Sequence, residues 1–342
     1  MLNLFLVCVS DIYYKNTIFN LNSPLNRDNY WYPYYLLREL CHKSNISLNT
    51  YDYLYDKADK NIKLLFFDIP KNFNEYLKIH SEIDKYLVIW ECSVVNANNW
   101  NKENHSHFKK IFTWHDDYVD GIKYIKYYWP NKLPENMEFE FKKDKLCCMI
   151  AGNKYFRHPL ELYSERIKAT RFFEENHPGD FDLYGIGWNE YYFRRPLTRL
   201  NRIGFLKKIC APYYPSYRGK IESKKSILSR YKFSICYENA RDIPGYITEK
   251  IFDSFFACCI PIYWGSNNIH NYIDKRCFID KRNFKSYEEL YKYFKSMSNS
   301  EYISYLDAIK NFIKSDKMYL FSGENFADTL IKENGNEKSF ID

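Results

Sequence analysis

Hydrophobic positions in the first part of the chain alternate between short apolar runs and longer amphipathic stretches. The short runs predict β-strands at residues 2–9, 64–68, 86–90 and 111–114. Between them, apolar residues recur with helical spacing, which predicts helices at residues 30–42, 72–83 and 100–109. Strands that alternate with helices indicate a parallel sheet in an α/β domain.

The same alternation restarts after a polar, proline-containing stretch at residues 129–145, which we interpret as an interdomain linker. Strands are predicted at 146–151, 181–185, 233–237 and 260–264, and helices at 161–176, 220–230 and 248–259. Three more amphipathic patterns, at 286–297, 301–314 and 324–333, predict helices that close the chain. We therefore predict an N-terminal α/β domain over residues 1–140 and a C-terminal α/β domain over residues 141–342.

Composition supports a folded protein and narrows its class. The 342 residues are 46% hydrophobic and 27% charged, which is typical of a globular chain of this size. The net charge of +7 is compatible with an anionic ligand or surface. The ten cysteines form no CxxC pair and lie mostly in apolar runs, so we expect buried free thiols. With no predicted signal peptide or membrane span, we expect a cytoplasmic setting.

The segment at residues 231–265 combines a predicted strand, a polar loop and a predicted helix. Apolar and polar residues alternate up to Tyr237, and the loop that follows contains Pro244 and Gly245. Thr248 is a favourable N-cap residue for the amphipathic helix after the loop. In doubly wound sheets, ligands bind where such loops leave the carboxyl ends of the strands.

Glu249 and Lys250 are expected in the first turn of that helix. The amide groups at a helix N-terminus favour a phosphate group. A lysine at this end is unfavourable to the helix dipole, and a bound diphosphate would explain it. Glu249 could then accept hydrogen bonds from ribose hydroxyls. The alternative is an ordinary solvated Glu–Lys pair.

The sequence YENARDIPGYITEKIFDSFFACCIPIYWGS, at residues 237–266, resembles the signature of the family 10 glycosyltransferases, the α-1,3/1,4-fucosyltransferases. Further similarity lies at residues 90–91, 111–114, 151–153, 164–166 and 217–220. The best match is to bacterial-type members without a membrane anchor. The resemblance implies a GT-B fold, with two doubly wound Rossmann-like domains that face a cleft. It also implies transfer of L-fucose from GDP-fucose to a glycan with inversion, α-1,3 to an N-acetylglucosamine-type residue.

The resemblance carries over roles for the donor site. Asn239, Tyr246, Glu249 and Lys250 match the donor-binding motif, in which the lysine would contact the diphosphate and the glutamate the ribose. Arg166 matches an arginine that clamps the diphosphate, a task for which a planar guanidinium is suited. The alternative for Arg166 is a surface cation on a helix.

Inversion requires a general base that takes the proton of the acceptor hydroxyl. Glu91 follows a predicted strand and matches the base proposed for the family. Asp68, Asp116 and Asp117 are rivals. The last two lie in a polar loop after residue 114 that could line the acceptor side or could simply form a capping turn.

We expect no obligatory metal cofactor, because no Asp-x-Asp motif lies at a strand end in the nucleotide half and two cations are already available for the diphosphate. The expected partners are GDP-fucose and an oligosaccharide or glycolipid acceptor, with no nucleic acid. The chain lacks the heptads and basic tail of some bacterial members, so peripheral association with the inner membrane surface stays open. The alternatives are a GT-B transferase for another nucleotide sugar and a non-catalytic glycan- or nucleic-acid-binding protein.

Overall fold

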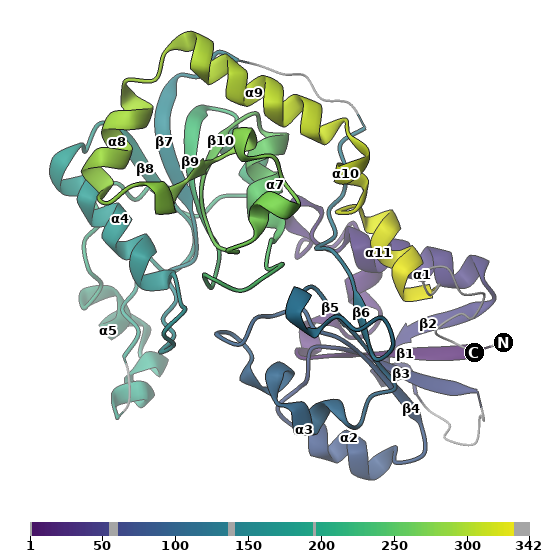
Figure 1. Cartoon of the computed structure of the whole chain (residues 1–342). Helices are drawn as coiled ribbons and strands as arrows, with labels where there is room; N and C mark the ends of the chain where they lie inside the picture. The colour runs from purple at the N-terminus through teal and green to yellow at the C-terminus, as the bar shows by residue number, and fades with distance from the viewer. Residues whose placement is uncertain (1, 55–60, 136–140, 194–195, 332–342) are drawn as a thin grey trace.

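The computed structural model describes residues 2–54, 61–135, 141–193 and 196–331, which form two parallel sheets flanked by helices (Figure 1). The N-terminal sheet has the strand order β2-β1-β3-β4-β5-β6, and its paired strands are all parallel. The strands are β1 (Leu2–Cys8), β2 (Ile46–Thr50), β3 (Ile62–Phe67), β4 (Asp84–Val88), β5 (Lys110–Thr113) and β6 (Tyr124–Lys126). The helices of this part are α1 (Tyr32–Lys43), α2 (Phe73–Ile79) and α3 (Lys102–His105).

The C-terminal sheet has the order β11-β10-β9-β7-β8, again with parallel pairs. Its strands are β7 (Lys145–Ile150), β8 (Phe181–Tyr184), β9 (Tyr231–Tyr237), β10 (Ile260–Trp264) and β11 (Ile279–Asp280). The helices from β7 to β10 are α4 (Tyr163–Asn176), α5 (Gly204–Ile209), α6 (Lys224–Leu228) and α7 (Glu249–Phe256). The closing helices are α8 (Tyr287–Lys295), α9 (Asn299–Ile313), α10 (Asp316–Tyr319) and α11 (Gly323–Ile331).

Both sheets reverse their direction of growth once, which is the mark of a doubly wound fold. In the N-terminal sheet the reversal lies between β1 and β3, and in the C-terminal sheet between β7 and β9. Ligands of such sheets bind beyond the carboxyl ends of the strands at these points. The predicted fold class, two doubly wound Rossmann-like α/β domains, is confirmed. The loops after β3 and β9 are therefore the places to look for a site.

Helix α11 departs from the predicted division of the chain at residue 140. Phe326 and Leu330 are fully buried in the core of the N-terminal domain. The Tyr32 hydroxyl of α1 donates to Glu324 of α11 over 2.8 Å. Figure 1 shows α11 beside α1, so the last helix returns to the N-terminal domain instead of closing the C-terminal one. The amphipathic pattern predicts a helix, but it does not specify which core receives its apolar face.

Short elements account for the other differences from the predicted pattern. Strands β2, β6 and β11 and helix α5 were not predicted, because five residues or so carry too little periodicity to stand out. The helix predicted at residues 220–230 is only the five-residue α6, and the helix predicted at 100–109 is only the four-residue α3. The helix predicted at 72–83 ends at Ile79. Part of the predicted linker, and the end of the helix predicted at 324–333, lie outside the described residues.

Candidate active site

The loop between β9 and α7 is built around a buried carboxylate that the sequence did not single out. Glu238 has no exposed surface, and it accepts hydrogen bonds from the backbone amide of Thr248 at 2.8 Å and from its hydroxyl at 2.7 Å. Thr248 does occupy the N-cap position of α7, but its hydroxyl serves Glu238 and makes no capping bond within the described chain. Thr248 therefore leaves the first amide groups of α7 without a capping bond, so these amides can donate hydrogen bonds to an anion.

Lys250 sits over this loop as a firmly held cation. Its Nζ lies 2.9 Å from the hydroxyl of Thr248 and 3.2 Å from Oε2 of Glu238. Burial by itself would lower the lysine pKa, but the carboxylates of Glu238 and Glu249 raise it well above its usual value. A quarter of the side chain stays exposed.

Glu249 is partly exposed at the start of α7. Burial alone would raise its pKa, but the positive charges of Lys250 and Lys224 outweigh burial and hold the pKa below the usual value. Lys224 lies 3.9 Å from Glu249 and 2.6 Å from Asp253. Glu249 is therefore an ionised hydrogen-bond acceptor near neutral pH, as a contact to ribose hydroxyls requires.

Arg166 is buried, which excludes the alternative of a surface cation. Only 4% of its surface is exposed. Its Nη2 donates to the carbonyl oxygens of Tyr237 at 2.7 Å and Glu238 at 2.8 Å, and to Oδ1 of Asn239 at 3.2 Å. The guanidinium thus holds the carboxyl end of β9 and places a positive charge beside the loop between β9 and α7. We call this loop the donor loop, because the residues expected to bind the donor lie in it and at the start of α7.

Tyr246, also expected in the donor motif, joins the two domains. Its ring is 1% exposed and packs in the core of the N-terminal domain, with its centroid 4.5 Å from that of Trp114. Burial raises its pKa well above the usual value, so the phenol stays neutral. This packing fixes the donor loop against the N-terminal domain, and a direct contact of Tyr246 with the donor stays a prediction.

Glu91 follows β4, and its backbone is held from both sides. Its amide donates to Oδ1 of Asp68 over 3.0 Å, and its carbonyl accepts from the side chains of Asn99 at 3.2 Å and Trp100 at 3.1 Å. Its Oε2 is buried with no hydrogen-bond partner among the described residues. Burial raises the pKa of this carboxyl, and the charges of Lys250 and Lys154 offset part of the rise. The cation of the donor loop therefore lies close enough to act on Glu91 from the other domain.

Tyr30, which the sequence did not single out, lies near both carboxylates. Its hydroxyl accepts a hydrogen bond from the indole of Trp90 over 2.8 Å. Its pKa is raised mainly by burial, and then by the negative charges of Glu249 and Glu91. Because the charges of both Glu249 and Glu91 act on this one hydroxyl, the donor loop and the candidate base lie near each other.

Asp68, a rival for the base, has a positioning role in the structure. It is 4% exposed and accepts from the amide of Trp90 at 2.6 Å, the amide of Glu91 and the side chain of Asn99 at 2.6 Å. Burial, together with the charge of Glu91, raises its pKa to about 7. Its oxygens are occupied by the loop that carries Glu91, so Asp68 acts on that loop.

The loop after β5 contains the other two rivals. Asp116 accepts at Oδ1 from Lys126 and Tyr272 and at Oδ2 from Asn268, two of which come from the C-terminal domain. Burial alone would raise its pKa, but these hydrogen bonds lower it. Asp116 thus links the two domains, and its expected place on the acceptor side stays a prediction. Asp117 is exposed, and its amide donates to His115 in a capping turn, so its role on the acceptor side stays a prediction.

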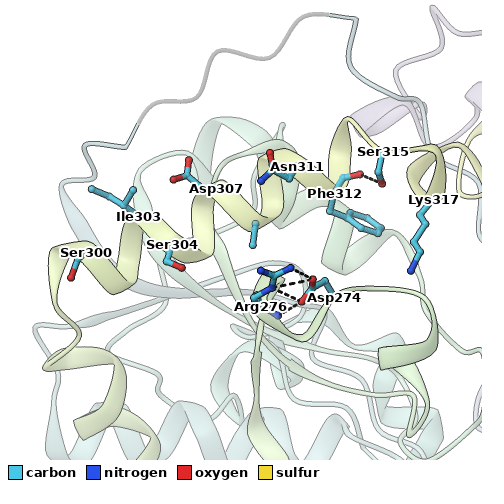
Figure 2. Close-up of a pocket in the computed structure, with 11 residues that line it drawn as sticks. Asp274, Arg276, Ser300, Ile303, Ser304, Asp307, Asn311, Phe312, Ser315 and Lys317 are labelled. Carbon is cyan, nitrogen blue, oxygen red and sulfur yellow. Dashed lines mark hydrogen bonds and ion pairs between the residues drawn. The ribbon is translucent and has the colours of Figure 1, made fainter.

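Other features of the described chain bear on its chemistry. All ten cysteines are unpaired, and nine of them are buried. Across the described ranges, no cluster of His, Cys, Asp or Glu is arranged to hold a metal ion. Nor does any helix in these ranges combine the length and apolar character needed to cross a membrane. A groove of about 500 Å³ runs beneath α9, with Arg276 paired to Asp274 on its floor (Figure 2). It contains none of the residues assigned to the donor or the base.

Comparisons with known proteins match this site to a family. A model described as "Glycosyltransferase family 10 (fucosyltransferase) C-term" matches residues 207–324. The chain is 37% identical over 89 residues to the alpha-(1,3)-fucosyltransferase FucT of Helicobacter pylori, which is 26% of this chain and 18% of that protein. It is 37% identical over 175 residues to the 4-galactosyl-N-acetylglucosaminide 3-alpha-L-fucosyltransferase 9 of Mus musculus, 50% of this chain and 38% of that protein.

The matched stretches thus span less than half the length of these relatives. A solved structure of an alpha1,3-fucosyltransferase with GDP-fucose has a TM-score of 0.50 and 16% identity, and the match covers 92% of each chain. At that identity the likeness shows the fold, which is GT-B. Asn239, Tyr246, Glu249 and Lys250 lie inside the region matched by the family model, whereas Glu91 and Arg166 lie outside it. Residues 207–324 therefore match the family 10 glycosyltransferase model within a chain whose fold is GT-B, in agreement with the resemblance predicted from residues 237–266.

Proposed function

We propose that this protein transfers L-fucose from GDP-fucose to a glycan acceptor with inversion at the anomeric carbon. The observation that carries the proposal is the proximity of Lys250 and Glu91, which come from different domains: the positive charge of Lys250 opposes the rise in the pKa of Glu91 that burial causes. The family match and the names of the relatives support fucose as the sugar. The solved neighbour that contains GDP-fucose supports this donor.

The donor loop supplies the chemistry that a nucleoside diphosphate needs. The first amides of α7, the cation of Lys250 and the buried guanidinium of Arg166 would together receive the diphosphate. The ionised Glu249 would accept hydrogen bonds from the ribose. Because the protein already supplies these cations, we propose that the reaction does not need a metal ion.

Glu91 has the properties of a general base. In the proposed reaction its carboxylate takes the proton of the acceptor hydroxyl while the hydroxyl oxygen attacks the anomeric carbon of fucose. The bond from that carbon to the diphosphate oxygen breaks on the opposite face, and GDP leaves with the electron pair. Lys250 and the α7 amides stabilise the charge that develops on the diphosphate. Attack opposite to the leaving group inverts the configuration.

The acceptor proposal is a glycan with an N-acetylglucosamine-type residue, fucosylated in α-1,3 linkage. It is supported by the name of the Mus musculus relative, a 4-galactosyl-N-acetylglucosaminide 3-alpha-L-fucosyltransferase. A cytoplasmic setting fits the ten unpaired cysteines, because reduced thiols persist there.

A thermal-shift panel of nucleotides and nucleotide sugars tests the donor. GDP and GDP-fucose should raise the melting temperature, because a ligand that binds only the folded state stabilises it. UDP, UDP-glucose and single-stranded oligonucleotides should leave it unchanged. Stabilisation by a uridine nucleotide would favour a GT-B transferase for another sugar. A response to glycans or nucleic acid without any response to GDP would favour a non-catalytic binding protein.

A further inference from the structure

A segment between β8 and α6 carries an unusual concentration of exposed apolar side chains. We call the described part of it, residues 186–193 and 196–213, the basic excursion. It contains eight of the twenty large hydrophobic side chains that are exposed in the described structure. Phe205 is 70% exposed, Ile209 62% and Tyr213 81%. Such a concentration of exposed apolar side chains within one segment points to an interaction surface.

The same segment concentrates positive charge. The basic excursion contains four Lys or Arg residues and one acidic residue, a net charge of +3 within a chain whose total is +7. The acidic residue, Glu190, is already paired with Lys207. Arg199, Arg202 and Lys208 are exposed among the apolar side chains. The surface that binds the excursion must therefore accept both apolar side chains and cations.

Helix α5 shows how the two properties combine. Phe205 and Ile209 are four residues apart and so share one face of the helix, next to Lys208. Figure 1 shows α5 projecting from the C-terminal domain, on the side of the molecule away from α10 and α11. Aromatic and aliphatic side chains that enter the acyl boundary, flanked by Lys and Arg at the headgroups, are typical of interfacial membrane segments.

We propose that the basic excursion docks the protein on an anionic lipid surface. Its charge favours this partner over a second copy of the chain, because a symmetric contact would bring two patches of +3 together. The exposed Phe, Leu and Ile side chains favour it over nucleic acid, which offers no apolar layer to receive aliphatic groups.

The base of the excursion is tied to the active-site edge of the C-terminal domain. The indole of Trp188 donates to the carbonyl of Ala151 over 2.7 Å, and Asn153 donates to the carbonyls of Ile186 and Gly187 at 2.8 and 3.1 Å. These residues adjoin Lys154, whose charge acts on Glu91. Docking would hold the candidate site close to the membrane, where a glycolipid acceptor would be presented. This consequence for the acceptor, unlike the docking itself, rests on the proposed function.

Vesicle flotation tests the proposal. The full chain should float with phosphatidylcholine vesicles that contain about 30% phosphatidylglycerol and should stay behind with pure phosphatidylcholine. The double variant Phe205→Ser/Ile209→Ser should lower the bound fraction by about tenfold, because two insertable side chains are lost. Arg199→Glu/Arg202→Glu should also lower it, and added salt should weaken binding of the wild type.

The matched control is Ile122→Ser, because Ile122 is 78% exposed on the N-terminal domain and should have no effect on flotation. GDP affinity and turnover of a soluble oligosaccharide should be unchanged in the Phe205→Ser/Ile209→Ser variant, which separates docking from catalysis. The proposal is overturned if the wild type does not float with anionic vesicles, or if this variant floats equally well. A wild-type dimer that this variant converts to monomer would instead identify the excursion as an interface between copies.

Discussion

The donor loop and the loop after β4, which carries Glu91, differ in how they hold their charged side chains. In the donor loop, Lys250 is held by Glu238 and Thr248 and keeps its charge under all ordinary conditions. In the loop after β4, the backbone of Glu91 is held by Asp68, while its Oε2 has no hydrogen-bond partner in the described chain. One region is prepared to receive an anion and the other to receive a proton. This division of labour is what a transfer from a diphosphate to a hydroxyl requires.

The largest effect is expected at the proton acceptor. Glu91→Gln should lower turnover by a factor of about 10²–10⁴, the usual contribution of a general base, and should leave GDP affinity unchanged. The amide keeps the size of the side chain but cannot take a proton. The test is to measure turnover, and GDP affinity by calorimetry, in the same variant: turnover should fall and affinity should not.

The pH profile sharpens this test. Burial raises the pKa of Glu91, and only the ionised form accepts a proton, so wild-type turnover should fall on acidification at a pH above the ordinary glutamate range. That limb should disappear in Glu91→Gln. If this variant works normally and Asp117→Asn does not, the base lies in the loop after β5.

The second largest effect concerns the donor cation. Lys250→Ala should weaken GDP binding by about 1.5–3 kcal/mol, the worth of a charged hydrogen bond, and nearly abolish transfer. Lys232→Ala, at the other end of β9, is the matched control and should bind GDP normally. Isothermal titration with GDP measures both.

Loss of Lys250 also leaves Glu238 buried beside fewer positive charges, so the variant should melt at a lower temperature. The double variant Glu238→Gln/Lys250→Met removes both charges and should regain stability without regaining GDP affinity. Recovery of GDP binding in the double variant would show that Lys250 acts only on the fold of the loop.

A smaller effect is expected at Arg166. Arg166→Lys should weaken GDP binding by about 1–2 kcal/mol, because an ammonium cannot reproduce the planar array of donors that holds the end of β9. Arg171→Lys, further along α4, is the control, since Arg171 pairs with Glu174 away from the donor loop. Equal GDP affinity in the two variants would remove Arg166 from the donor site.

The smallest effect is expected from removal of metal ions. Turnover should be unchanged in excess EDTA, because Lys250, Arg166 and the α7 amides are proposed to neutralise the diphosphate. A loss of turnover that added divalent cation restores would show that a metal ion is part of the mechanism.

The two regions also differ in how far the sequence predicts them. The donor loop is one continuous stretch, so its strand, its helix and the place of Lys250 follow from local patterns. Glu238 was missed as its anchor because its partners, Thr248 and Lys250, are set by the path of the loop. The surroundings of Glu91 are assembled from Asp68 and Asn99, which are brought next to Glu91 only by the order of the strands in the sheet. A single strand-end carboxylate predicts a candidate base but not the side chains that hold it.

Interdomain contacts were the least predictable part of the molecule. The local sequence around Tyr246 and Asp116 is compatible with ligand contacts, yet Tyr246 packs on Trp114 and Asp116 binds Asn268 and Tyr272. Helix α11 returns to the N-terminal domain for the same kind of reason, since an apolar helix face fits any core that is close enough. Such long-range choices depend on the assembled surfaces of both domains.

The central claim is that Lys250 and Glu91 act together in the transfer of fucose from GDP-fucose. Mass spectrometry of a lactosamine acceptor incubated with GDP-fucose, using the wild type and Glu91→Gln side by side, tests it most directly. The account predicts that the wild type adds a single deoxyhexose to the N-acetylglucosamine residue and that Glu91→Gln adds almost none while still binding GDP. Product formed from a uridine nucleotide sugar and not from GDP-fucose, or equal product from both proteins, would contradict it.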